Sequence, residues 1–122
     1  MPVTDLGYSH VAVSPPGERI ATLAGQSGHD AGGTLPETFE SQLSQALRNV
    51  ARAVTYIGCS TEDVMRLQIF VADCDSAKLA VTSRQLKAVW PGCRPAMTLV
   101  PVPRLALDGM LVVVEATATV PS

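Results

Sequence analysis

The stretch Met110-Leu-Val-Val-Val-Glu-Ala-Thr-Ala-Thr-Val120 decides the fold more than any other part of the chain. Successive side chains of an extended strand point to opposite faces, so this stretch has two distinct faces. One face mixes apolar residues with one carboxylate and two hydroxyls. The other face is wholly apolar and is expected to be buried; it consists of Val112, Val114, Ala116, Ala118 and Val120.

Four further stretches are rich in β-branched and apolar residues or alternate with a period of two, which predicts strands. A turn at Pro15-Pro16-Gly17-Glu18 predicts that the first two of them form a hairpin. Proline has no backbone N–H, so Pro101 and Pro103 predict that the last of them ends there or lies at a sheet edge. The four stretches are residues 8–14, 19–24, 64–71 and 96–100.

Two helices are predicted between these strands. The first starts near Pro36-Glu37-Thr38 and Gly58 is placed to stop it. The second covers roughly residues 76–90, with Asp73 and Asp75 as candidate N-caps. Leu79, Ser83, Leu86 and Trp90 are expected on its buried face. The first helix is indicated by apolar residues at spacings of three and four, namely Phe39, Leu43, Ala46, Leu47, Val50, Val54 and Ile57.

The predicted order of elements is β-β-α-β-α-β-β. Strands and helices do not alternate strictly, which favours an α+β fold with a mixed sheet and both helices packed on one face. The length of 122 residues fits one domain covering residues 1–122. A chain of this size and composition folds without a metal or disulfides.

Composition excludes several classes of partner. The net charge is −2, the basic residues are scattered singly and aromatic residues make up 4%, so no nucleic-acid surface is expected. No stretch has the roughly 18 apolar residues of a membrane span. Three widely spaced cysteines fit neither a disulfide framework nor a CxxC metal site. A cytoplasmic protein without cofactor or metal is the expectation.

Several short motifs, taken together in their order and spacing, resemble the RidA (YjgF) family. The resemblance implies a chorismate-mutase-like α+β protomer that assembles as a homotrimer. It also implies a small-molecule cleft at each subunit interface, lined by two chains. The motifs are Tyr8-Ser-His, Gly17-Glu-Arg-Ile leading to Ala24-Gly-Gln26, Gln45-Ala-Leu-Arg-Asn-Val50, Glu62-Asp-Val64, Arg94-Pro-Ala96, and Arg104-Leu-Ala-Leu-Asp-Gly-Met-Leu-Val112 followed by Glu115-Ala116.

One departure from the family stands out. In the best-studied members the Arg-Pro-Ala run ends in a second arginine, which holds the carboxylate of a 2-imino or enamine acid. Here that position is Met97. A guanidinium offers two parallel N–H donors to a carboxylate, whereas a thioether offers none. We therefore expect weakened carboxylate binding.

Other departures point the same way. Val113 aligns with the family glutamate that helps to position water, while Glu115, two residues later, is retained. Ala24 replaces a serine, Ser83 aligns best with an asparagine, and Leu99 replaces a cysteine found in some members. These changes remove polarity from the implied cleft, so a less charged or more hydrophobic ligand is expected.

Four further residues each have a functional and a structural interpretation. Tyr8 either matches a tyrosine of the cleft or packs at the end of a strand. Gly25 either presents its backbone N–H to a ligand or is a turn glycine. Arg94 is a surrogate for the missing arginine or a solvated loop residue. Glu115 is a general base or pairs with a cation of a neighbouring chain.

Three functions remain open at this point. The first is an imine or enamine deaminase-like hydrolase with altered specificity. The second is a non-catalytic ligand-binding or regulatory trimer that keeps the cleft. The third is an accessory protein of a biosynthetic pathway that shields a labile intermediate. Loss of both the arginine and the glutamate raises the second and third relative to the first.

Overall fold

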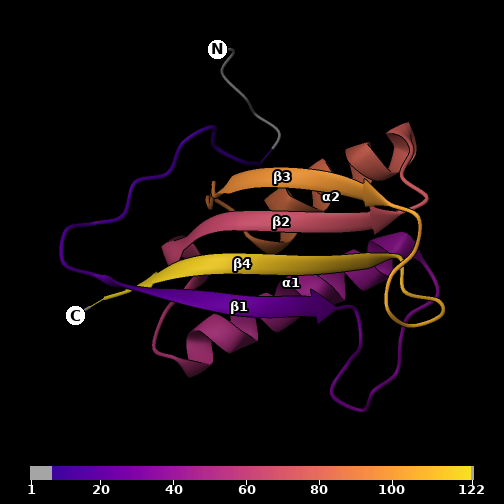
Figure 1. Cartoon of the computed structure of the whole chain (residues 1–122), viewed down its shortest axis with the longest axis horizontal. Coiled ribbons are helices and arrows are strands. Elements are labelled where there is room, and N and C mark those ends of the chain that lie inside the picture. The colour runs from indigo at the N-terminus through magenta and orange to yellow at the C-terminus, as the bar shows by residue number, and fades with distance from the viewer. Residues whose placement is uncertain (1–6, 122) are drawn as a thin grey trace.

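A four-stranded sheet carries two helices on one of its faces. The computed structural model describes residues 7–121. Figure 1 shows the strands in the order β1-β4-β2-β3, where β1 is Arg19–Ser27, β2 is Val64–Ala72, β3 is Ala96–Val102 and β4 is Val112–Val120. β4 runs antiparallel to β1 and β2, whereas β3 runs parallel to β2. The predicted mixed sheet is confirmed.

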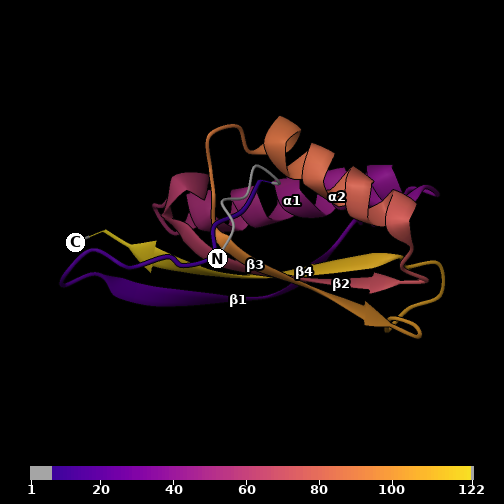
Figure 2. The same ribbon diagram turned by 90° about the horizontal axis from the view of Figure 1, so that it is seen from above.

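β4 occupies a central place in the sheet, as its sequence indicates. Val112, Val114, Ala116 and Ala118 are all buried, so the apolar face is the core face. Figure 2 shows both helices on that side of the sheet. The hydrophobic effect therefore fixes β4 in place between the helix layer and its two neighbouring strands.

Helix α1, Phe39–Tyr56, forms as predicted. The Thr38 side chain caps it by accepting a bond from the Ser41 N–H (3.1 Å), and Gly58 follows it in the left-handed region with φ of 85°. Ile57 was expected on the buried face but is 40% exposed, because it lies beyond the last helical turn as the C-cap.

Helix α2, Ser76–Val89, has Asp75 as its N-cap, which accepts a bond from the Lys78 N–H (2.8 Å). Leu86 and Trp90 are buried as predicted, and Ser83 is half-buried. The prediction for Leu79 is wrong, since this side chain is 51% exposed. The first turn directs Lys78 inward instead, where its ammonium group binds the carbonyl groups of Ala72 and Asp73 (2.9 Å each) and lies over the Phe39 ring.

The predicted strand at residues 8–14, and with it the predicted hairpin, is wrong. This segment forms only an isolated parallel bridge between Ser9 and Ala96. Figure 1 shows it passing the β3 side of the sheet before the chain reaches β1 at the opposite edge. Pairing with β1 is therefore impossible, and Val11 and Val13 remain exposed.

β3 is an edge strand, as its prolines predict. It continues through Pro101 to Val102, further than expected, because an edge strand needs no donor on its outer side. β2 contains an irregularity between Val64 and Arg66 that changes which residues face the core. Val64 is buried and Met65 is half-buried, so the strict alternation of faces along the strand begins only after this irregularity.

Candidate functional site

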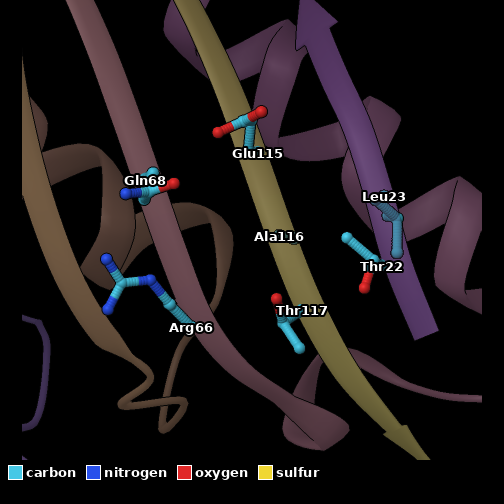
Figure 3. A pocket seen from close by; sticks show the side chains of 7 residues that line it. All are labelled: Thr22, Leu23, Arg66, Gln68, Glu115, Ala116 and Thr117. Atoms are coloured by element: carbon cyan, nitrogen blue, oxygen red, sulfur yellow. The ribbon is translucent and has the colours of Figure 1, made fainter. Parts of the chain in front are cut away.

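The sheet face opposite the helices bears a depression of ≈ 220 Å³. Figure 3 shows Arg66 and Gln68 projecting from β2 beside Glu115 and Thr117 from β4. The remaining lining residues are Thr22, Leu23 and Ala116. The neighbouring strands thus place a cation, an amide, a carboxylate and two hydroxyls on one surface.

A hydrogen-bonded chain connects the three most polar residues of this depression. With the Gln68 amide assigned in the orientation that satisfies both of its neighbours, its nitrogen donates to Glu115 Oε1 (3.0 Å) and its oxygen accepts from Arg66 Nη2 (3.0 Å). The ladder sets Gln68 directly opposite Glu115. The Glu115 carboxylate is therefore bound by an uncharged donor, Gln68. The Arg66 guanidinium binds Gln68 and not the carboxylate itself.

Gly25 lies in a β-bulge of β1 and approaches β4 closely. A Cβ atom added to Gly25 would lie 2.5 Å from Val113 Cγ1 and 3.9 Å from Glu115 Cγ. Only glycine fits this contact without a shift of Val113. Ala24, the other residue of the bulge, is exposed. The structure thus brings Ala24, Gly25, Val113 and Glu115 together.

Met97 and Leu99 lie on the opposite side of the sheet. They pair with Leu67 and Ile69 of β2, whose side chains are fully buried on the helix side. Met97 and Leu99 are half-buried and pack against the same hydrophobic core. The thioether at position 97 is therefore in an apolar environment at a sheet edge.

Tyr8 and Arg94 lie beside the beginning of β3. Arg94 Nη2 donates to the Tyr8 carbonyl (3.2 Å), and Ser9 Oγ donates to the Arg94 carbonyl (2.5 Å). The Tyr8 ring meets the His10 ring edge-on at 5.9 Å between centroids. The Arg94 guanidinium thus holds the N-terminal segment against β3, where Ser9 bridges to Ala96, the neighbour of Met97.

The nine residues considered from the sequence fall into two groups. One group is at the β1–β4 side on the open face: Ala24, Gly25, Val113 and Glu115. The other is at the β3 edge and α2: Tyr8, Ser83, Arg94, Met97 and Leu99. β1 and β3 are three strand spacings apart, which is about 14 Å. The two groups cannot line one cleft within a single protomer.

The three cysteines are free. Burial raises the pKa of the Cys59 thiol, and the carboxylate of Asp63 raises this pKa further. Residues 7–121 contain no group of three or more His, Cys, Asp or Glu side chains that could hold a metal. Within the same residues, neither helix is long and apolar enough to cross a membrane.

Sequence reasoning did not foresee the roles of Arg66, Gln68 and Gln42. Arg66 and Gln68 are two residues apart and so share a face of their strand, but their pairing with Glu115 depends on a register that the sequence does not reveal. Gln42 lies outside the apolar spacing that predicts α1, and yet it is 1% exposed. Its partners are backbone groups distant in sequence, so no local pattern indicates them.

The fold and its edge-strand surroundings define a small α+β protein of the YjgF type. The chain belongs to the endoribonuclease L-PSP family, also called the Rid or YjgF family, whose family model matches residues 2–120. This finding confirms the family resemblance and the fold class expected from the sequence.

Solved structures agree with this assignment. The Rid-family protein YyfB from Yersinia pestis is 34% identical, with a TM-score of 0.87 over 95% of this chain and 89% of that chain. Rv2704 from Mycobacterium tuberculosis is 27% identical, with a TM-score of 0.71 over 93% and 87%. TdcF from E. coli, solved with bound serine, shares the fold at 23% identity, with a TM-score of 0.74 over 94% and 95%. Comparison with curated proteins gives no match.

Proposed function

We propose that this Rid-family protein binds a small metabolite in clefts between the subunits of a homotrimer. We further propose that the ligand is less charged or more hydrophobic than the 2-imino acids that the resemblance implies for the family. The observation that supports the proposal is the environment of Met97, which is half-buried against the hydrophobic core at the position where the family resemblance implies an arginine. An apolar side chain in an apolar environment has no hydrogen-bond donor for a carboxylate.

The separation of the site residues supports a cleft shared by two chains. Gly25 and Val113 lie on the open sheet face, whereas Met97 and Leu99 lie at the far edge on the helix side. Each group alone is an incomplete site. Contact between the β1–β4 face of one copy and the β3 edge of another would bring the two groups together.

The position of Arg94 supports the loss of the usual carboxylate contact. Its guanidinium donates a hydrogen bond to the Tyr8 carbonyl and so holds the N-terminal segment in place. Moving it toward Met97 would cost that bond and loosen the N-terminal segment. Arg94 is therefore a poor surrogate for the missing arginine.

Two functions remain compatible with this cleft. In the first, the protein hydrolyses an imine, an enamine or a related metabolite, with Glu115 accepting a proton from water. In the second, it binds a metabolite without turnover, as a regulatory trimer or as an accessory protein of a pathway. The bond from Gln68 engages Glu115 Oε1 and, within residues 7–121, leaves Oε2 available, so it is compatible with both functions. The three free thiols fit a reducing cytoplasm.

The test compares wild type with Met97→Arg and Met97→Leu in a 2-aminoacrylate hydrolysis assay, with semicarbazide as the competing trap. We expect low activity in the wild type and in Met97→Leu. Activity should rise in Met97→Arg by roughly tenfold or more, because one bond to a charged group contributes about 1.5–3 kcal/mol. Wild-type hydrolysis as fast as that of Met97→Arg would overturn the proposal of altered specificity.

Serine is a useful second probe because TdcF was solved with it bound. If the cleft has lost its cation, serine should bind the wild type more weakly than Met97→Arg. A thermal-shift titration measures this, since a ligand that binds only the folded state raises the apparent stability. Binding without hydrolysis in all variants would select the regulatory or accessory function.

A further inference from the structure

A groove of ≈ 690 Å³ lies between the two helices, away from the sheet. It is bordered by α1, by the C-terminal end of α2 with its C-cap Trp90, and by Thr61. Figure 2 shows α1 and α2 side by side on the outer side of the molecule. Ligand pockets commonly have volumes of about 300–1,000 Å³, so this groove is large enough for a small organic molecule.

Two arginines line this groove from α1. Arg48 and Arg52 are one helical turn apart, so their side chains emerge from the same face of the helix. Both are exposed, and within residues 7–121 neither has a hydrogen bond or ion pair. Like charges at this spacing destabilise a helix slightly, which an anion bound between them would relieve.

The nearest acidic side chain on the same helix is already engaged. Glu40 Oε1 accepts bonds from Gln85 Nε2 (2.9 Å) and Arg84 Nη2 (3.4 Å) of α2. Its charge is therefore engaged by Arg84, and among residues 7–121 neither Arg48 nor Arg52 forms an ion pair. The groove thus has an electropositive wall on a chain whose net charge is −2.

The rest of the lining combines the apolar residues Ala51, Ala88, Val89 and Trp90 with the polar residues Ser44, Thr61 and Gln85. Trp90 is 2% exposed and is held by a bond from its indole N–H to the Leu47 carbonyl (3.3 Å). Val89 and Ala51 are half-buried and lie beside it in the lining. An apolar floor next to two guanidinium groups suits a molecule with an anionic head and an aliphatic body.

We propose that the α1–α2 groove is a second binding site, which takes an amphipathic carboxylate. Arg48 and Arg52 bind the carboxylate, and Val89 and Trp90 receive the aliphatic chain. The site is built only from residues of the two helices and Thr61, so it does not depend on the subunit-interface cleft or on Met97.

Trp90 makes the test local, since it is the single tryptophan of the chain. Octanoate, kept below its micelle concentration, is titrated into the full-length protein while tryptophan fluorescence is recorded. We expect saturable binding, weaker binding of acetate because it lacks the chain, and no binding of octanamide because it lacks the charge. Affinity should fall roughly tenfold or more in Arg48→Gln/Arg52→Gln.

Two controls accompany this variant. Arg19→Gln/Arg104→Gln removes the same charge from other parts of the surface and should bind octanoate as the wild type does. Val113→Lys disrupts the proposed interface cleft on the open sheet face and should leave the signal unchanged. Circular dichroism establishes that each variant is folded.

Three results would overturn the proposal. They are the absence of a saturable octanoate signal in the wild type, equal affinity in Arg48→Gln/Arg52→Gln, and a loss of signal in Val113→Lys as large as in the double variant. The last result would assign the fluorescence change to the interface cleft. A failure of the imine assay would leave this proposal intact, because the two sites share no residue.

Discussion

Met97 lies half-buried at the edge of the sheet, and this setting suits a thioether better than a cation. A guanidinium carries a charge that is costly to bury, so an arginine there would keep its stem on the core and extend its head past β3. The head would then point beyond the protomer. An arginine at position 97 could therefore reach a ligand at the edge of the protomer, which is the contact that the family resemblance implies and that a methionine cannot make.

Cys59 provides a prediction that depends on pKa. Its thiol is 9% exposed and donates to the Thr119 carbonyl (3.4 Å), and burial raises its pKa. The thiolate is the reactive form, so Cys59 should be the slowest of the three cysteines to react with iodoacetamide at neutral pH. Peptide mapping after timed alkylation measures this; faster labelling of Cys59 than of Cys74 would contradict it.

The same shift has a consequence for stability. A folded-state pKa above the unfolded value stabilises the protein fully below the unfolded pKa of a thiol, about 8.5, and this stabilisation is lost as the pH rises through the folded pKa. The free energy of unfolding should therefore decline above about pH 8.5. The decline should be smaller in Cys59→Ala, as measured by urea unfolding at several pH values.

At the residue scale, the sequence yielded candidate positions but not the directions of their side chains. Met97 was identified because it departs from a motif. Its direction follows from the pairing of Leu67 with Met97, a parallel register between strands separated by a helix. No local pattern encodes that register, so the core-facing environment of Met97 could be learned only from the structure.

At the scale of elements, Gln42 joins α1 to the loop before β4. Its amide nitrogen donates to the carbonyls of Pro36 (2.8 Å) and Gly109 (2.9 Å), and its oxygen accepts from the Leu111 N–H (2.8 Å). Gly28 packs directly on this point, since an added Cβ would lie 2.6 Å from Gln42 Cα. Gln42 therefore ties the ends of three segments together.

Replacing Gln42 should be costly for this reason. Gln42→Leu keeps the bulk but leaves buried backbone groups without partners, each at about 1–3 kcal/mol, so we expect a loss of about 2–4 kcal/mol of unfolding free energy. Gln45→Leu, on the same helix, removes only a bond to Asn49 and should cost less than about 1 kcal/mol. Equal losses of unfolding free energy in the two variants would show that the hydrogen bonds of Gln42 stabilise the fold no more than the single bond of Gln45 does.

Elements with a strong intrinsic pattern were predictable, and those fixed by tertiary contacts were not. β4, α1 and α2 were identified from periodicity and capping residues, because those signals are local. The segment at residues 8–14 has strand-like composition but no neighbouring strand beyond one bridge at Ser9. A strand requires a partner, which composition cannot supply.

At the scale of the whole molecule, one face of the sheet is covered by the helices and the other is left open in a single copy of the chain. The open face bears the Arg66–Gln68–Glu115 chain and the Gly25–Val113 contact, while the helices cover only the other face. Ile20, Val11 and Val13 add exposed apolar side chains to the chain's surface. A second copy would cover such a surface and complete the divided site.

Association is therefore predicted for the purified protein. Sedimentation equilibrium should give the mass of three chains of 12.8 kDa, without a monomer at micromolar concentration. Val113→Lys places a charge on the open face and should shift the population toward smaller species, whereas Leu79→Lys, on the exposed side of α2, should not. A wild-type monomer would remove the basis for a cleft lined by two chains.

The most direct test is the calorimetric affinity of a small 2-keto acid, 2-ketobutyrate, for wild type and Met97→Arg at the same ionic strength. The prediction is weak binding by the wild type and an affinity gain of roughly tenfold to several hundredfold in Met97→Arg, the equivalent of one or two charge-assisted bonds. Equal affinities, with tight binding by the wild type, would contradict the claim that this chain has lost its carboxylate grip at position 97.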